Sequence, residues 1–315
     1  MNHKEKSFEK EVPEKEILES EIYENEINNK SVERQKEASK TKKRKKRVLV
    51  LVLLVLVILI ACDFRLKTVR YTFTSPKVEN DFKIALITDL HGNSYGKEQS
   101  SLIKAIDKEN PDVVLLSGDI FDDIIDYEES EETIAILSKK YKCYYVTGNH
   151  EYWSKDVDNI IDIVKSYDIT VLQGDVDTID INGQLVNICG VDDPENYVYL
   201  DGGETLETQV KRIDEKANRE YYTILLSHRP EYYELYSQYG FDLVLSGHAH
   251  GGQWRIPGIL NGLYAPNQGL FPKYAGGVYD YDGGTLVVSR GLDRQGVKVP
   301  RIFNRPELVI IEVSP

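Results

Sequence analysis

Five short apolar segments, each followed directly by polar residues that can bind metal ions, constrain the fold of this chain more than any other feature. They read "FKIALIT", "DVVLLS", "CYYVT", "TILLS" and "FDLVLS", and their content of Val, Ile, Leu and Tyr is typical of buried β-strands. Amphipathic stretches at 97–110, 130–141 and 156–167 predict helices among them. This alternation predicts a layered α/β body with sheets inside and helices outside.

Further strand-like segments follow in the second half of the sequence. "VDTIDI" and "QLVNICG" are joined through Asn182-Gly183, a dipeptide that favours a tight hairpin turn. "GTLVVSRG" and "PELVIIEV" come near the C-terminal end. The strand-rich second half therefore extends the sheets rather than forming a separate helical domain.

The polar residues after the five strands are expected to meet at one place. Ligands of α/β sheets bind at the carboxyl edge of the strands, and the five strands deliver these side chains there: Asp89, His91, Asp119, Asp122, Asn149, His150, His228, His248 and His250. Five of the six histidines of the chain belong to this set. Residues two apart in an extended segment face the same way, so His248 and His250 can point into one site.

The chemistry of this set indicates a metal centre. It combines imidazole, carboxylate and an amide oxygen without thiolate, which suits Mn, Zn or Fe better than a structural zinc cage. Seven or more candidate ligands exceed the needs of one ion. The set therefore predicts two divalent metal ions that share a bridging carboxylate.

The same residues stand in five sequence blocks, "DLH", "GDIFD", "GNHE", the histidine of "SHRP", and "GHAH". This series resembles the calcineurin-like metallophosphoesterase superfamily, whose pattern is D-x-H, G-D-x-x-D, G-N-H-E, a later H and G-H-x-H. The resemblance covers residues 81–315 and implies a four-layer α-β-β-α sandwich. "GHAHGGQWRIP" and "RIFNRPEL" further resemble a membrane-associated bacterial phosphoesterase subgroup, whereas "RGLDRQGVKVP" is longer than the link expected there.

The resemblance also implies a role for each site residue. One metal ion would be held by Asp89, His91, Asp119 and His250. The other would be held by Asp119, Asn149, His228 and His248, so that Asp119 bridges the two. His150 would face the substrate phosphate as a catalytic residue, and Asp122 would orient His150 or a ligand.

These residues predict a metal-dependent phosphoric ester hydrolase of the phosphodiesterase or pyrophosphatase type. Two metal ions would lower the pKa of a bridging water, and the resulting metal-bound hydroxide would attack phosphorus. His150 would stabilise the developing charge or protonate the leaving oxygen. Candidate substrate contacts on nearby loops are Arg229, Arg255, Tyr264, Tyr274, Arg290 and Arg294. The substrate is expected to be a phosphorylated small molecule or a lipid-linked phosphate.

The N-terminal region predicts attachment to a membrane. Residues 1–47 form a charged tail ending in "KKRKKR", and fifteen uninterrupted apolar residues follow at 48–62. As a helix this run would span roughly 22 Å, so Phe64 and Leu66 are needed to approach the ~30 Å of a bilayer core. We expect a cytoplasmic tail (1–47), one transmembrane anchor (48–66), a linker (67–80) and an extracytoplasmic catalytic domain (81–315) in the cell membrane. Lipidation of Cys62 in "LIAC" is the alternative anchor.

The net charge of the body bears on whether the protein binds nucleic acid. Residues 1–47 carry 14 Lys and Arg against 11 Glu, a net charge of +3, so the rest of the chain carries −16 and the whole chain −13. An acidic body does not favour nucleic-acid binding, so no nucleic-acid partner is expected and a secreted nuclease is the weaker alternative. A catalytically inactive metal-binding scaffold is the other alternative, although no ligand position has been lost.

Overall fold

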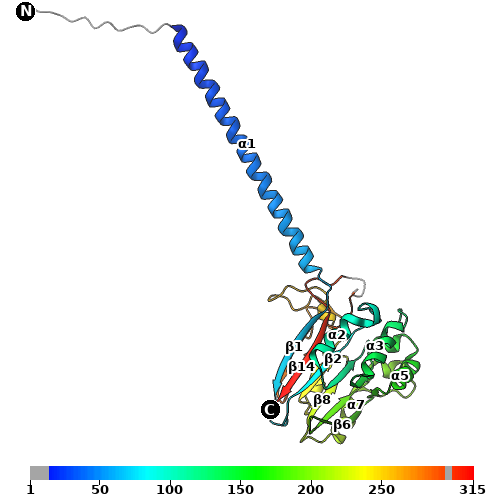
Figure 1. Ribbon diagram of the computed structural model, residues 1–315. Helices are drawn as coiled ribbons and strands as arrows, with labels where there is room; N and C mark the ends of the chain where they lie inside the picture. The colour runs from blue at the N-terminus through cyan, green and yellow to red at the C-terminus, as the bar shows by residue number, and fades with distance from the viewer. Residues whose placement is uncertain (1–13, 295–299) are drawn as a thin grey trace, which may run out of the picture. The chain divides into compact units, whose positions relative to one another are not determined.

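Two six-stranded β-sheets form the body of the protein in residues 14–294 and 300–315, the parts that this computed structural model describes (Figure 1). The first sheet has the order β1-β14-β2-β3-β4-β5, with bounds β1 Lys67–Thr74, β14 Glu307–Ser314, β2 Phe82–Ile87, β3 Val113–Ser117, β4 Lys142–Val146 and β5 Thr170–Val171. The second has the order β12-β13-β9-β8-β7-β6, with bounds β12 Gly277–Tyr281, β13 Gly284–Val288, β9 Leu243–Ser246, β8 Tyr222–Leu226, β7 Gln184–Gly190 and β6 Asp175–Ile181. A short hairpin joins β10 (Tyr264–Ala265) to β11 (Gly269–Leu270).

Three layers of buried apolar side chains hold the sheets and helices together. The middle layer lies between the sheets and mixes residues of both, such as Leu86 and Leu115 with Ile188 and Leu245. The outer face of the first sheet packs against helices α2 (Ser100–Glu109), α3 (Glu128–Ser138) and α5 (Val157–Ser166). The outer face of the second sheet packs mainly against α7 (Leu206–Lys216) and α8 (Tyr233–Tyr236). The body thus has the four-layer α-β-β-α arrangement expected from the sequence.

Short helical segments complete the described elements. They are α4 (Asn149–Trp153), α6 (Glu195–Tyr199) and the 3-10 turns η1 (Lys97–Gln99), η2 (Pro230–Tyr232) and η3 (His250–Gly252). Three of them, α4, η2 and η3, begin within four residues of the ends of β4, β8 and β9. They therefore lie at the edge where the sequence places its metal-capable residues.

Parallel pairing brings the carboxyl ends of the central strands to one edge. β2, β3 and β4 are parallel in the first sheet, and β7, β8 and β9 are parallel in the second. The Ser117 hydroxyl at the end of β3 donates to the Leu245 carbonyl of β9 at 3.2 Å. This buried contact joins the two sheets at that edge, and all five strands that the sequence analysis placed there are present.

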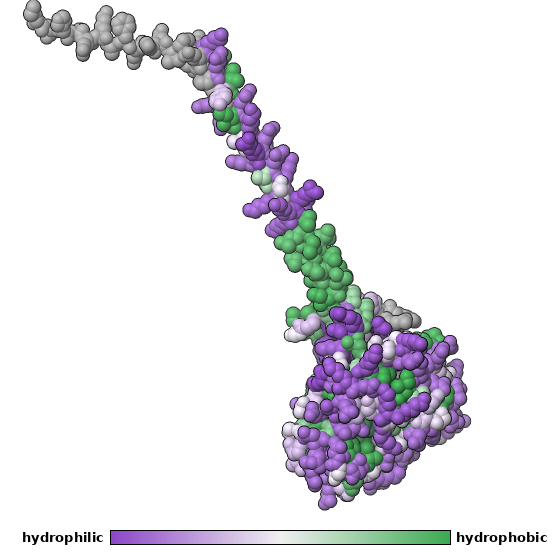
Figure 2. Space-filling view, in the orientation of Figure 1, coloured by the Kyte–Doolittle hydropathy of each residue, from purple (hydrophilic) through white to green (hydrophobic). Residues whose placement is uncertain are grey.

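The N-terminal region differs from the expected transmembrane anchor at 48–66. A long helix, α1 (Glu14–Ala61), includes the apolar run and ends before Asp63, whose carboxylate accepts hydrogen bonds from Arg65. Leu66 packs against the core of the body and cannot extend the helix. Across the described ranges, no helix combines the length and the apolarity needed to cross a membrane. Figure 2 shows the apolar stretch as a green band, and its side chains from Val48 to Ile60 are 47–64% exposed.

Residues 67–80, expected to be a linker, contain β1. This strand pairs in parallel with β14 from Lys67–Glu307 to Thr74–Ser314. Its side chains alternate, and Tyr71 and Phe73 pack against the core between the sheets. The chain divides into two compact units, Met1–Leu59 and Ile60–Pro315, and β1 belongs to the second.

Candidate metal centre

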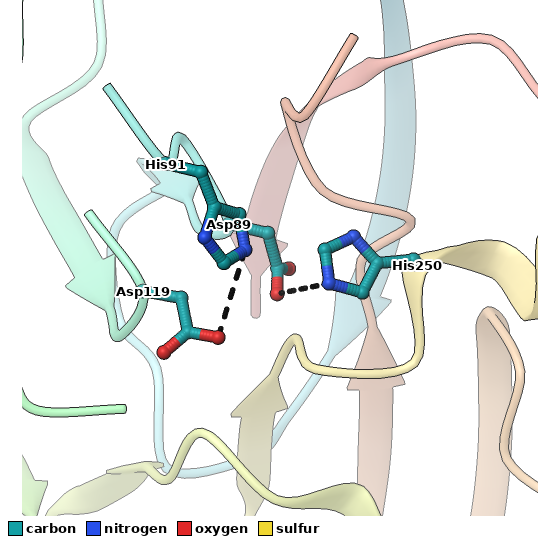
Figure 3. A group of neighbouring side chains, drawn as sticks. All are labelled: Asp89, His91, Asp119 and His250. Carbon is teal, nitrogen blue, oxygen red and sulfur yellow. Dashed lines mark ion pairs between the residues drawn. The ribbon is translucent and has the colours of Figure 1, made fainter. Parts of the chain in front are cut away.

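The predicted ligands lie at the ends of strands from both sheets and are all buried. Asp89 and His91 follow β2, Asp119 follows β3, and Asn149 begins α4 directly after β4; His228 follows β8, and His248 and His250 follow β9. In Figure 3, Asp89, His91, Asp119 and His250 turn their side chains toward one another. Strand ends separated by up to 161 positions in the chain are thus assembled at one place.

The described residues contain three overlapping groups whose candidate ligand atoms lie within 4.8 Å of one another. The first group is Asp89, His91, Asp119 and His250, and the second is Asp119, His228 and His248. The third, which combines His91, Asp122 and His150, is a hydrogen-bonded cluster described below. Asp119 is common to the first two groups, as a bridging carboxylate has to be.

Distances within these groups match a centre built around Asp119. His91 Nε2 lies 3.6 Å and His228 Nε2 3.0 Å from Asp119 Oδ2. His250 Nε2 lies 3.7 Å from Asp89 Oδ1 (Figure 3). Donor atoms from both sheets therefore converge on the space next to two carboxylates.

Four atoms of the centre fit a metal ion better than a hydrogen-bonded core. His91 Nε2, Asp119 Oδ2, Asn149 Oδ1 and His228 Nε2 are buried and make no well-aligned hydrogen bond within the described structure, although His228 Nε2 and Asp119 Oδ2 lie 3.0 Å apart. Buried polar atoms without a partner carry a free-energy penalty, so native proteins contain few of them. All four can donate a lone pair to a cation, which makes the residues present a suitable ligand set for divalent metal ions.

Glycines next to the ligands make room for the ligand side chains. A Cβ atom at Gly148 would lie 2.2 Å from Asp119 Oδ1, and one at Gly247 would lie 2.5 Å from Asp89 Oδ2. The sequence analysis identified the glycine-flanked blocks, and the structure gives their physical reason. Any larger residue at either position would displace a carboxylate of the centre.

A family model described as calcineurin-like phosphoesterase matches residues 82–252, from β2 to the end of the "GHAH" block. The chain belongs to this family. The matched range includes all seven candidate metal ligands, His150 and Asp122.

Several relatives of this family are similar over most of the body. An uncharacterized metallophosphoesterase of Campylobacter jejuni is 31% identical over 247 residues, which cover 76% of this chain and 61% of the relative. An uncharacterized metallophosphoesterase of Aquifex aeolicus is 29% identical over 261 residues, covering 79% of this chain and 92% of the relative. A Bos taurus protein named transmembrane protein with metallophosphoesterase domain is 28% identical over 260 residues, which cover 76% of this chain and 55% of the relative. The chain thus spans less than two thirds of the length of some of these relatives.

Carboxylates outside the ligand groups orient two imidazoles of the centre. Asp122 Oδ2 lies 2.9 Å from His91 Nδ1 and 3.3 Å from His150 Nδ1. Asp123, which the sequence analysis did not single out, lies closer to His150, with 2.6 Å between Oδ1 and Nδ1. Both rings are thereby held by Nδ1, which leaves Nε2 directed away from these carboxylates.

Glu151 links the loops that carry Asp119 and Asn149. Its fully buried carboxylate accepts backbone N–H bonds from Asp119, Ile120, Phe121 and Gly148 at 2.7–3.0 Å. The backbone N–H of His150 in turn donates to Asp119 Oδ1 at 2.9 Å. The last residue of the "GNHE" block therefore fixes the position of the shared carboxylate through the backbone.

Residues far from the motifs hold the two histidines of the "GHAH" block. Asn267, at the turn of the β10–β11 hairpin, places its Oδ1 2.9 Å from His248 Nε2. Nδ1 of the His248 ring is therefore the atom left to bind a metal ion. Asn304 donates to the His250 carbonyl at 2.7 Å. Arg301 Nη2 lies 3.5 Å and Asp293 Oδ2 3.8 Å from His250 Nδ1. No local sequence pattern marks these four residues.

Charges at the centre shift the pKa values of its groups in opposite directions. Burial opposes the positive charge of His228 and of His150, but the nearby carboxylates, Asp119 foremost, outweigh it and raise the pKa of each to about 10. Burial, together with neighbouring positive charge, holds the pKa of His248 and of His250 well below the ordinary value. Without metal ions, the centre thus combines protonated and neutral imidazoles.

Two of the expected substrate-binding arginines have carboxylate partners within the protein. Arg229 is buried and pairs with Asp193, with Nε 2.6 Å from Oδ2, and its Nη1 donates to Asn267 at 2.8 Å. Arg290 pairs with Glu307 at 3.1 Å. The other candidates remain predictions, and of these Tyr264 is half exposed and Tyr274 buried.

Proposed function

We propose that the protein hydrolyses phosphoester or pyrophosphate bonds at a dinuclear metal centre. The observation that carries this proposal is the position of Asp119 in both ligand groups, next to buried lone-pair donors without hydrogen bonds. One ion is assigned to Asp89, His91, Asp119 and His250, and the other to Asp119, Asn149, His228 and His248. Divalent ions bound there would polarise a phosphoryl oxygen and lower the pKa of water.

The side chains around the centre supply orientation and protons. Asp122 keeps Nε2 of His91 turned toward Asp119, and Asn267 keeps Nδ1 of His248 available. His150 has Nδ1 bound to Asp123, and in the metal-free protein the nearby carboxylates, Asp119 foremost, outweigh burial and raise its pKa to about 10. A protonated His150 would stabilise negative charge on the phosphoryl oxygens and could donate a proton to the leaving oxygen.

The first prediction tests the shared carboxylate. We expect purified protein to bind about two transition-metal ions per chain and to hydrolyse bis-p-nitrophenyl phosphate with Mn²⁺. Asp119→Ala should lose most of both ions and nearly all activity, because it removes a ligand from each group. Elemental analysis and the release of p-nitrophenol measure the two effects.

Asp162→Ala, at an exposed position on α5, is the matched control and should keep both ions and full activity. Full metal content in Asp119→Ala would contradict the bridging assignment. Two bound ions with no hydrolysis of monoesters, diesters or pyrophosphates would instead favour the metal-binding scaffold.

We also propose that the protein is attached to a membrane by the apolar end of α1. Its side chains from Val48 to Ile60 are apolar on every side of the helix and exposed, and a helix that is apolar all round normally lies in a protein core or in lipid. The basic cluster Lys42–Arg47 precedes it, as is common beside membrane-embedded segments. The bovine relative named as a transmembrane protein supports the same proposal.

The second prediction concerns this attachment. Full-length protein should sediment with membranes and stay there in alkaline carbonate, whereas Leu53→Asp together with Leu56→Asp should release most of it. The basic cluster is expected to keep the tail in the cytoplasm. Protease added to intact protoplasts should therefore digest the body and spare the tail. Resistance of the body to protease would place it in the cytoplasm and contradict the extracytoplasmic location.

A further inference from the structure

An exposed apolar surface adjoins the metal centre on the segment that follows His250. We call it the apolar rim, and it consists of Trp254 (43% exposed), Ile256 (50%), Ile259 (84%), Tyr264 (52%), Leu270 (67%) and Phe271 (66%). Large apolar side chains gathered on one short segment usually mark a surface that contacts another molecule. The rim lies beyond residue 252, where the family match ends.

The rim is built on the hairpin that reaches the metal ligands. Tyr264 and Leu270 are paired residues of β10 and β11. Asn267, in the turn between these strands, lies 2.9 Å from His248 Nε2 and accepts a hydrogen bond from Arg229. The hairpin that carries Tyr264 and Leu270 therefore also reaches a candidate ligand of the metal centre.

The rim also adjoins the place where the chain enters the body. Trp254 pairs with Ile302, and the indole N–H of Trp254 donates to the Pro300 carbonyl at 3.0 Å. The next residue, Phe303, donates its backbone N–H to the Ala61 carbonyl at 2.7 Å. Within the second unit, the rim and Ala61 are thus joined through residues 300–303, and the apolar run of α1 immediately precedes Ala61 in the chain.

From these contacts we infer that the apolar rim lies on a lipid bilayer and that the substrate is an amphiphilic phosphoester held in that bilayer. The apolar run needs lipid cover, and the rim adjoins its attachment point. Trp and Tyr, which the rim contains, favour the boundary between lipid and water. The inference rests on the proposed function, because it places the apolar part of the substrate in lipid and its phosphate at the metal ions.

The test compares two esters with the same reacting group. Full-length Mn²⁺-loaded protein is given methyl p-nitrophenyl phosphate in solution, or hexadecyl p-nitrophenyl phosphate in phosphatidylcholine vesicles. In both, water adds to phosphorus, the P–O bond to the aryl group breaks, and p-nitrophenol and the alkyl phosphate are released. We expect kcat/KM to be at least about tenfold higher for the vesicle-bound ester.

Ile259→Gln together with Leu270→Gln should lower hydrolysis of the vesicle ester about tenfold, since both side chains leave the lipid. Hydrolysis of the methyl ester should stay within about twofold, because neither residue touches the ligand groups. Leu185→Gln is the matched control. Leu185 is 42% exposed, but it lies at the N-terminal end of β7, away from the carboxyl edge that carries the metal centre. It should leave both rates unchanged.

A second measurement reports on the rim without catalysis. The chain has two tryptophans, so Trp153→Phe leaves Trp254 as the fluorescent reporter. Brominated phosphatidylcholine vesicles should quench its emission, and Ile259→Gln with Leu270→Gln should reduce the quenching. Unquenched emission from protein that has sedimented with the vesicles would overturn the inference.

The outcomes separate this inference from the proposed function. Failure to hydrolyse either ester, with both metal ions bound, would refute the proposed function, while quenching would still support lipid contact of the rim. Hydrolysis of the methyl ester without preference for the vesicle ester, and without quenching, would overturn only the inference. Dimers that dissociate in Ile259→Gln with Leu270→Gln would likewise overturn it, because the rim would then cover a second copy of the chain.

Discussion

His150 lies beside the metal ligands but belongs to neither of the two groups that share Asp119. Its ring stacks edge-on against His91, with 4.4 Å between centroids, and its Nδ1 is held by Asp123. Its backbone N–H fixes Asp119, and that contact does not depend on the side chain. Replacing the imidazole therefore tests the chemistry of the ring separately from metal binding.

The third prediction is that His150→Asn discriminates between leaving groups. Alkyl phosphoesters need a proton on the leaving oxygen, whereas p-nitrophenolate leaves readily without one. If His150 donates that proton, kcat on alkyl esters should fall about 10²–10⁴-fold and kcat on p-nitrophenyl esters much less. Metal content, measured in parallel, should stay near two ions per chain.

Equal losses on both ester types, with both ions retained, would show that His150 only stabilises charge on the phosphoryl oxygens. Asp123→Asn is the companion variant, because it weakens the hold on Nδ1 while leaving the ring in place. Asp123→Asn should also lower kcat on alkyl esters more than kcat on p-nitrophenyl esters, but by a smaller factor than His150→Asn.

Sequence reasoning identified the candidate ligands because each lies within a short block directly after a strand. It could not identify Asn267 or Asn304, since their contacts with His248 and His250 join segments that have no shared local pattern. Arg229 was interpreted as a substrate contact because it stands next to His228. The structure pairs it with Asp193, 36 positions away, a contact that no spacing rule reveals, and its contact with substrate stays a prediction.

At the scale of elements, the segment between β13 and β14 acts as a support for the "GHAH" block. Arg301 is buried, donates to the Arg290 carbonyl at 2.7 Å and lies against the His250 ring. Asn304 bonds the His250 carbonyl from the same segment. The residues that separate this chain from the expected shorter link, in "RGLDRQGVKVP", lie within this support, and positions 295–299 are outside the described residues.

The fourth prediction is that Arg301→Lys weakens one metal site more than the other. Lysine keeps the charge but lacks the planar fork that contacts Arg290 and His250 together. Loss of an outer partner of a ligand typically lowers metal affinity 10–100-fold, and we expect this loss at the ion assigned to His250. Calorimetric titration of metal-free protein with Mn²⁺ would resolve the two sites.

Arg305→Lys serves as the control, since Arg305 lies on the same segment but bonds the Arg65 and Leu66 carbonyls. It should leave both affinities unchanged. Equal weakening of both sites by Arg301→Lys would mean that Arg301 supports the fold generally and does not position His250.

The layers of sheets and helices in the body could largely be predicted from the sequence, whereas strand β1 and the end of the apolar helix could not. Strands and helices of the body have strong period-2 or amphipathic patterns, and the hairpin at Asn182-Gly183 has a local turn signal. β1 was missed because its pairing partner, β14, lies at the other end of the chain. Asp63 and Leu66 follow the end of the apolar helix. Asp63 pairs with Arg305 and Leu66 packs on the core, and neither contact can be inferred from hydropathy.

The fifth prediction concerns proton balance in the whole metal-free protein. The pKa of His228 is raised to about 10, mainly because Asp119 outweighs the effect of burial, so the ring is charged at pH 7.5. A histidine must be neutral to bind a metal ion, and binding therefore releases the proton of His228. Mn²⁺ affinity should rise between pH 6 and pH 9, and calorimetry in PIPES and in Tris should report release of about one proton or more per chain.

His228→Asn should reduce this release by about one proton. In the metal-free protein, the stabilisation that comes with the raised pKa of His228 is fully present below 6.5 and is lost as the pH rises through about 10. Thermal unfolding of metal-free protein should therefore occur at lower temperature at pH 10.5 than at pH 7. An affinity that is independent of pH would contradict the protonated state assigned to His228.

The position of β14 determines when the body can be completed during protein synthesis. β14 lies between β1 and β2, so two strands from the start of the body are held together by one from its end. A ribosome must translate all of the chain between β2 and β14 before the first sheet closes, and contacts so far apart in sequence form slowly. Until then, the strand edges of β1 and β2 that pair with β14 have no partner, and unpaired edges of this kind expose an incomplete chain to aggregation.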